Sequence, residues 1–100
     1  DSNVTDMYSG TPLRSACDGG YIEVVKLLLQ QGADVNAQGS FSDTPLRSAC
    51  DGGHIDIVRL LLQNGADVNA QGPYSDTPLC SACCHGHIEI VGLLLQNGAD

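Results

Sequence analysis

The chain carries a recurring pattern of apolar and polar residues, and residues 44–66 show it most clearly. A short first helix is predicted there, with a small apolar face at three- and four-residue spacing, formed by Leu46, Ala49 and Cys50. A second helix is predicted over residues 55–63, and apolar side chains cover most of its circumference. Its polar stripe consists of Asp56, Arg59 and Gln63. Because a helix with two apolar sides needs neighbours on both, the pattern predicts helix pairs that stack in a row.

The expected helix ends are marked by residues that suit those positions. The Thr44 hydroxyl can cap the first helix, and Pro45 fits its first position because the missing N–H would have no helical partner there. Gly65 suits a left-handed cap after the second helix, and the polar residues 67–76 predict an extended turn or hairpin finger. Applied to the whole chain, the pattern predicts an all-α protein with helices near residues 12–18, 22–30, 45–51, 55–63, 78–84 and 88–96.

The pattern recurs with a period of 33 residues and needs no insertion or deletion. The tripeptide Thr-Pro-Leu begins at residues 11, 44 and 77, and Gly-Ala-Asp begins at residues 32, 65 and 98. Residues 34–66 and 67–99 differ at only 7 positions, and residues 1–33 and 34–66 differ at 12. Such strict periodicity predicts one continuous domain of stacked units. The predicted units are residues 1–33, 34–66 and 67–100, the last including the first residue of a fourth unit.

The sequences TPLRSAC and DGGHIDIVRLLLQNGADVNA, together with the 33-residue period, resemble the ankyrin repeat over the whole chain. The resemblance implies an ankyrin-repeat solenoid of stacked helix–turn–helix units, with protruding hairpin fingers and a concave recognition face. It also implies a non-catalytic scaffold that binds another protein. Arg14, Arg47 and Cys80 stand where this family usually has a histidine that ties neighbouring repeats. We therefore expect those ties to be made differently here.

Neither end of the chain has a distinctly polar capping unit. The last predicted helix would leave one side exposed to solvent, because it carries a full set of apolar residues, Ile88, Ile90, Val91, Leu94 and Leu95. Two interpretations follow from this. The chain is a fragment of a longer array, or it is a module that associates end to end with other copies, in which case polar substitutions at Leu94 and Leu95 would abolish the association.

Composition narrows the classes of function. The 100 residues include 12 acidic and 4 basic side chains, a formal net charge of -8. Nucleic acids and anionic membranes bind basic surfaces, so neither is an expected partner. No apolar run approaches the roughly 18 residues of a membrane span, and no secretory signal is visible. We expect a protein partner with a basic or mixed-charge surface, and a cytoplasmic or nuclear location.

The five cysteines are an odd number, which does not suggest a disulfide framework. Cys17, Cys50 and Cys83 recur at the 33-residue interval, and we expect all three to be small buried apolar groups in a reducing compartment. Cys80, Cys84 and His85 are residue types that bind zinc. Their neighbours Cys83 and His87 are explained by repeat positions, so no metal site and no cofactor is predicted.

Differences between the units indicate the surface that contacts a partner. They concentrate in the fingers and at the ends of the first helices, which in ankyrin repeats are the surfaces presented to partners. The candidate binding residues of the fingers are Met7, Tyr8, Gln38, Ser40, Phe41, Asp43, Gln71, Pro73, Tyr74 and Asp76. The aromatic residues among them occupy one equivalent position, and two interpretations stay open. The rings anchor a partner, or each ring packs on its own finger.

The ends of the first helices add five candidate binding residues, Asp18, Arg47, Asp51, Cys84 and His85. Arg47 and Asp51 are four residues apart, as are Arg14 and Asp18, and in the third unit both members become cysteine. Either these pairs form a charged rim that selects a partner, or they only solvate their helices.

Catalysis is not expected. The chain has no Ser-His-Asp order, phosphate-binding loop or paired glutamates, and its histidines and aspartates occupy repeat positions. Asn36 and Asn69 carry a separate resemblance, because their segments are similar to ankyrin sites that intracellular oxygenases hydroxylate on asparagine. The alternative is that both asparagines only close the hairpin turn.

Overall fold

The computed structural model describes residues 12–37, 44–71 and 77–99, and these residues form six α-helices without a strand. The helices are α1 (Pro12–Gly19), α2 (Ile22–Gln30), α3 (Pro45–Gly52), α4 (Ile55–Gln63), α5 (Pro78–Cys84) and α6 (Ile88–Gln96). The predicted all-α architecture is therefore confirmed, and α1 and α3 each end one residue later than expected. None of the helices in the described part of the chain is long and apolar enough to cross a membrane.

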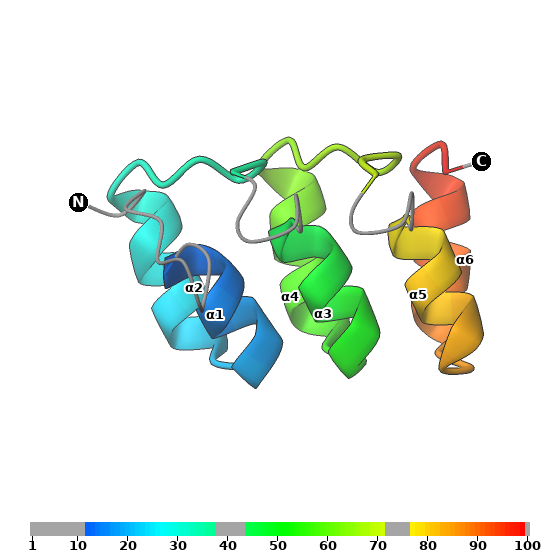
Figure 1. Cartoon of the computed structure of the whole chain (residues 1–100). Helices are drawn as coiled ribbons and strands as arrows, with labels where there is room; N and C mark the ends of the chain where they lie inside the picture. The colour runs from blue at the N-terminus through cyan, green and yellow to red at the C-terminus, as the bar shows by residue number, and fades with distance from the viewer. Residues whose placement is uncertain (1–11, 38–43, 72–76, 100) are drawn as a thin grey trace.

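The helices form three antiparallel pairs that stand side by side in one row (Figure 1). The first helices α1, α3 and α5 make one layer, and the second helices α2, α4 and α6 lie behind them (Figure 1). Neighbouring helices approach one another more closely in the first layer than in the second. The row is therefore concave on the side of the first helices.

Local chemistry explains where the helices begin and end. The Thr44 hydroxyl accepts a hydrogen bond from the backbone N–H of Arg47 (3.3 Å), and the Thr77 hydroxyl accepts one from the N–H of Cys80 (3.2 Å). A proline follows each of these threonines at the helix start. After α4, Gly65 has a φ of +89°, a left-handed conformation that glycine adopts without a Cβ clash. The caps expected from the sequence are confirmed.

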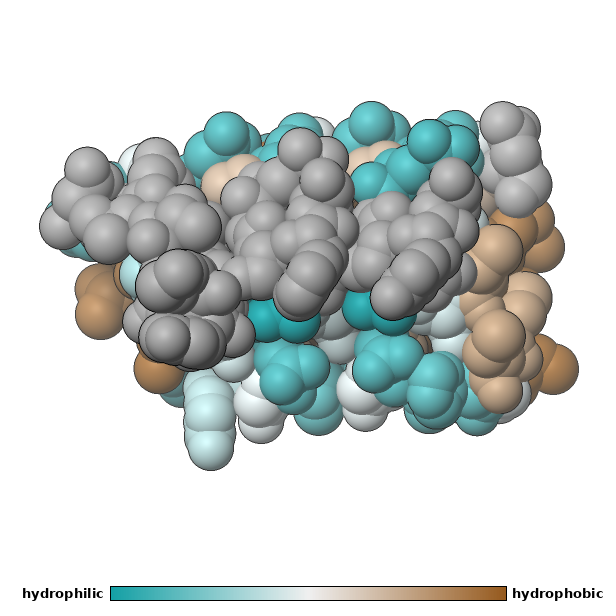
Figure 2. Space-filling view, viewed as in Figure 1, coloured by the Kyte–Doolittle hydropathy of each residue, from teal (hydrophilic) through white to brown (hydrophobic). Residues whose placement is uncertain are grey.

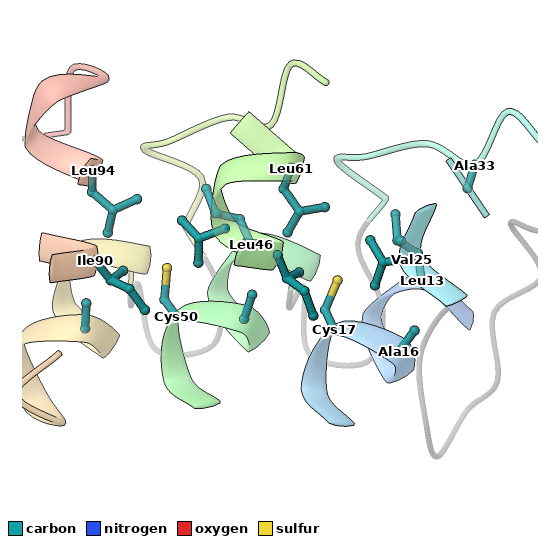
Figure 3. Close-up of a cluster of buried hydrophobic side chains, with 14 residues drawn as sticks. Leu13, Ala16, Cys17, Val25, Ala33, Leu46, Cys50, Leu61, Ile90 and Leu94 are labelled. Atoms are coloured by element: carbon teal, nitrogen blue, oxygen red, sulfur yellow. The ribbon is translucent and has the colours of Figure 1, made fainter. Parts of the chain in front are cut away.

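The core is one continuous apolar cluster that runs between the helix pairs. Figure 3 shows its side chains, including Leu46 of α3 and Leu61 of α4, in the spaces between neighbouring helices. The expected apolar face of α3, namely Leu46, Ala49 and Cys50, is fully buried. The polar stripe of α4 is exposed, as expected for the outer side of the row. Each layer of the core therefore needs side chains from two neighbouring pairs.

One burial expectation is wrong. Cys17 and Cys50 are 0% exposed, but Cys83, at the equivalent position of α5, is exposed. Helix α3 packs on α1 and α5 packs on α3, whereas no described helix covers the outer side of α5. Burial at this position therefore depends on the next helix pair.

Candidate protein-binding surface

The structure describes six of the candidate binding residues, Asp18, Arg47, Asp51, Gln71, Cys84 and His85. Nine others lie outside the described residues, namely Met7, Tyr8, Gln38, Ser40, Phe41, Asp43, Pro73, Tyr74 and Asp76. The interpretation of the aromatic row as partner anchors stays a prediction for this reason. Gln71, the described finger residue, is exposed.

Four of the described candidates, Asp18, Asp51, Cys84 and His85, lie at the C-terminal ends of the first helices and are called the helix-end ridge below. Asp18 and Cys84 occupy the same position in the first and third units, and Asp51 occupies it in the second. Asp18, Cys84 and His85 are exposed, and Asp51 is half-buried. The ridge lies at the ends of the first helices that are remote from the loops joining successive pairs (Figure 1). It therefore brings together positions that are 33 residues apart in the chain.

His85 connects the second and third units at this ridge. Its Nδ1 donates to the carbonyl oxygen of Ser81 (2.9 Å) and lies 3.4 Å from Oδ1 of Asp51. A carbonyl oxygen only accepts, so Nδ1 carries the hydrogen in this arrangement. The ring also stacks on that of His87, with centroids 5.8 Å apart and an interplanar angle of 8°. The ridge thus differs along the row. In the first unit it carries the carboxylate of Asp18, and between the second and third units it carries the carboxylate of Asp51 beside the stacked rings of His85 and His87.

Two histidines at equivalent repeat positions, His54 and His87, tie neighbouring units together. Nε2 of His54 donates to the carbonyl oxygen of Asp18, and Nε2 of His87 donates to that of Asp51, both at 3.4 Å. The rings lie against glycines of the preceding unit, where an added Cβ on Gly53 would be only 2.8 Å from Cε1 of His87. The recurrence of Gly-His at the 33-residue interval was the available signal.

Asn36 and Asn69 make the corresponding tie at the other end of the units. Nδ2 of Asn36 donates to the carbonyl of Gly65 (3.1 Å), and Nδ2 of Asn69 donates to that of Gly98 (3.2 Å). Within its own turn, the backbone N–H of Asn36 donates to the Asp34 carboxylate (3.0 Å). Each asparagine side chain thus joins the loop after one helix pair to the loop after the next pair, a role beyond closing its own turn. Hydroxylation of these residues stays a prediction.

Among the residues that the structure describes, open hollows lie between the units and repeat with them. At the turns, one of about 250 Å³ is lined by residues including Ile22 and Ile57, and one of about 220 Å³ by residues including Ile55 and Ile90. Between the second helices, the hollows measure about 310 and 220 Å³. Small-molecule sites are usually deeper clefts of roughly 300–1,000 Å³. This open surface suits contact with another macromolecule better than enclosure of a substrate.

Thiol chemistry differs sharply between buried and exposed cysteines. Burial raises the pKa of Cys17 and of Cys50 to about 12, with smaller contributions from the adjacent Asp18 and Asp51 carboxylates. Both thiols therefore stay protonated and inert near neutral pH. The exposed cysteines of α5 are Cys80, Cys83 and Cys84. Within the described ranges, no three histidine, cysteine or acidic side chains are grouped so that they could hold a metal ion.

The geometry defines a stacked helical repeat protein with an open concave face. The chain belongs to the ankyrin-repeat family, because a family model of three ankyrin repeats matches residues 15–100. Ankyrin repeats are generally protein–protein interaction modules and are typically non-catalytic.

Two relatives share part of this sequence. The chain is similar to inversin of Gallus gallus, at 49% identity over 37 residues, and to alpha-latrocrustotoxin-Lt1a of Latrodectus tredecimguttatus, at 49% over 39 residues. These matches cover 37% and 39% of this chain but only 3% of each relative. They therefore support the repeat itself and carry nothing about the activity of the whole relatives.

Proposed function

We propose that this chain binds a protein partner across the concave face of its first helices, with the helix-end ridge and the fingers as the contact surface. The observation that carries the proposal is the variation at the ridge. Asp18 and Asp51 give way to Cys84 at one position, and glycine gives way to His85 at the next, while the apolar core positions of the first helices stay the same. Variation on a constant framework is typical of a surface that determines specificity.

The framework favours binding by rigid display. Ties at both ends of the units, such as those of Asn36 and His54, hold the ridge side chains at fixed spacing. A partner that meets a pre-organised surface has little ordering cost to offset. Three units present a small face, so an interface of standard size, roughly 800 Å² on each side, would use most of it.

Charge determines the kind of partner that we propose. The chain has a formal net charge of -8, and the ridge carries Asp18 and Asp51 near the C-terminal ends of the first helices. Charged pairs occur on both layers, with His85 3.4 Å from Asp51 at the ridge and Arg59 3.6 Å from Asp56 on the second helices. These features support a partner with a basic or mixed-charge surface. Its association would be faster and tighter at low salt.

Two double variants with the same net charge test this proposal. Asp18→Asn with Asp51→Asn removes two carboxylates from the ridge, and Glu23→Gln with Glu89→Gln removes two from the second helices. Proteins captured from a cell lysate by the immobilised wild-type chain are identified by mass spectrometry, and their affinities are then measured at low and high salt. We expect the ridge variant to lose about tenfold in affinity, close to 1.4 kcal/mol, and the matched control to bind like the wild type.

Two results would contradict the proposal. Equal weakening by both double variants would mean that only the overall charge attracts the partner. An acidic partner whose binding is indifferent to ionic strength would mean that the charge of the ridge has no part in recognition. The finger residues, including Phe41 and Tyr74, can be tested by alanine substitution in the same assay, with circular dichroism to check helicity.

The location in the cell is also a proposal. Two buried free thiols and three exposed ones, in the residues that the structure describes, support a reducing compartment such as the cytoplasm or nucleus.

A further inference from the structure

The α1–α2 end of the row exposes apolar side chains that are covered in the other units. Val24 is 47% exposed and Leu27 is 55% exposed. Their equivalents one period later are Ile57, which is 2% exposed, and Leu60, which is half-buried. The difference arises because α4 packs against α2. Val24 and Leu27 therefore belong to the face that receives a preceding unit.

The opposite end, at α5–α6, exposes the complementary face. Ile88 is 81% exposed and Leu95 is 53% exposed, whereas their equivalents in α4, Ile55 and Leu62, are half-buried against the core. Cys83 is exposed for the same reason. Figure 2 shows hydrophobic surface at both ends of the row and hydrophilic surface over much of the visible middle.

The internal boundaries show which residues of these two faces meet. Leu29 shares a hollow with Leu60 between α2 and α4, and Leu62 shares one with Leu93 between α4 and α6. At the turns, Ile22 lies by Ile57 in the same way. One further step of the repeat would bring Leu95 of one copy against Leu27 of the next. The same step would bring Ile88 against Val24.

We propose that the α5–α6 end of one copy of this chain binds the α1–α2 end of a second copy, in register with the internal repeat. The occupant is a second copy because this chain itself carries both halves of an interface that it already builds twice. The contact is head-to-tail, so it leaves one open face at each end and produces chains of copies instead of a closed dimer.

Two features make this contact weaker than the internal boundaries. Tyr21 stands where His54 and His87 make their hydrogen bonds, so the new junction lacks that tie. Each copy also has a formal net charge of -8, and the copies repel one another. We therefore expect reversible association with a dissociation constant of about 0.1–1 mM, in keeping with a small interface. Added salt strengthens it by screening the repulsion, which is opposite to the salt effect on a basic partner.

Sedimentation velocity of the whole 100-residue chain, under reducing conditions, tests the proposal. Leu27→Asp blocks one face and Leu95→Asp blocks the other, both at exposed positions, and Gln63→Asp on the polar stripe is the control with the same charge. We expect the wild type and the control to grow in mass with concentration. Each blocked variant should stay monomeric alone, and an equimolar mixture of the two should form dimers and nothing larger.

Alkylation of Cys83 gives an independent measurement. In a Cys80→Ser, Cys84→Ser background, Cys83 should react more slowly as the protein concentration rises, because a second copy covers it. A wild-type chain that stays monomeric at about 1 mM would overturn the proposal. Association that persists in both blocked variants, or a mixture that stays monomeric, would overturn it equally. Circular dichroism of each variant separates loss of association from loss of folding.

Discussion

The side-chain amide of Asn36 donates a hydrogen bond to the carbonyl oxygen of Gly65 at 3.1 Å, across 29 residues of sequence. Its Oδ1 accepts another from the backbone N–H of Asp67 at 2.7 Å. One side chain thus joins the loop after α2 to the loop after α4. Asn69 repeats the first of these bonds with Gly98. Because the geometry recurs with the units, the tie belongs to the repeat architecture and maintains the spacing between successive helix pairs.

Asn36→Ala should lower the free energy of unfolding by about 1 kcal/mol, because two hydrogen bonds between the loops that follow α2 and α4 are lost at a site that water can partly solvate. Asn64→Ala is the matched control, since Nδ2 of Asn64 donates only to Leu60 of the same helix turn (2.8 Å). Urea denaturation followed by circular dichroism measures both. A control that loses as much stability as Asn36→Ala would contradict the importance of the tie between these loops.

Two glycine-to-alanine substitutions should change stability in opposite directions. Gly53 has a φ of +76°, and an added Cβ would lie 2.8 Å from the His87 ring, so Gly53→Ala should destabilise the fold by about 1–2 kcal/mol. Gly92 lies within α6, and a Cβ there would have no atom within 4 Å. Gly92→Ala should therefore stabilise the fold by about 0.5–1 kcal/mol. Thermal unfolding of the two variants provides the comparison, and a shift of the same sign in both would show that this account is wrong.

Thiol labelling should separate the five cysteines into two classes. Near pH 8, we expect Cys80, Cys83 and Cys84 to react quickly with an alkylating reagent, because all three are exposed. Cys17 and Cys50 should react only when the chain unfolds, since they are buried and their pKa is about 12. Intact-mass spectrometry counts the modified thiols with and without denaturant. Rapid labelling of Cys17 or Cys50 in the folded protein would refute the stacked core.

Stability should fall at alkaline pH because of the same buried thiols. Their pKa is about 12 in the folded chain, against an ordinary value of 9.0. Above pH 9 the unfolded chain releases these protons while the folded chain keeps them, so rising pH favours unfolding until about pH 12. Within this window, each thiol lowers the free energy of unfolding by at most about 1.4 kcal/mol per pH unit. Below pH 9 the two thiols add no pH dependence to the stability.

Urea midpoints between pH 8 and pH 11 measure the alkaline effect. The double variant Cys17→Ala, Cys50→Ala should show a flatter decline than the wild type, even though its stability near pH 8 is lower. An identical decline in both proteins would assign the effect to other groups.

The ridge illustrates how far the sequence could predict the candidate site. Comparison of the units identified Asp51 and His85 as candidate residues, because they vary or sit beside variable positions. It did not predict that His85 lies against Asp51, because these residues belong to different units. It also chose Leu94 as a position to disrupt self-association, which is wrong. Leu94 is fully buried, so a polar side chain there would unfold the third unit.

By itself, the sequence determined the six helices, their ends and their 33-residue period, because capping threonines, prolines and glycines act within a few residues of themselves. Only the tertiary structure decided which of the repeated side chains are covered. Cys50 and Cys83 both follow Ser-Ala near the end of a first helix, yet one is buried and the other is exposed. Burial of such a side chain depends on the next unit in space, and a local pattern does not contain that contact.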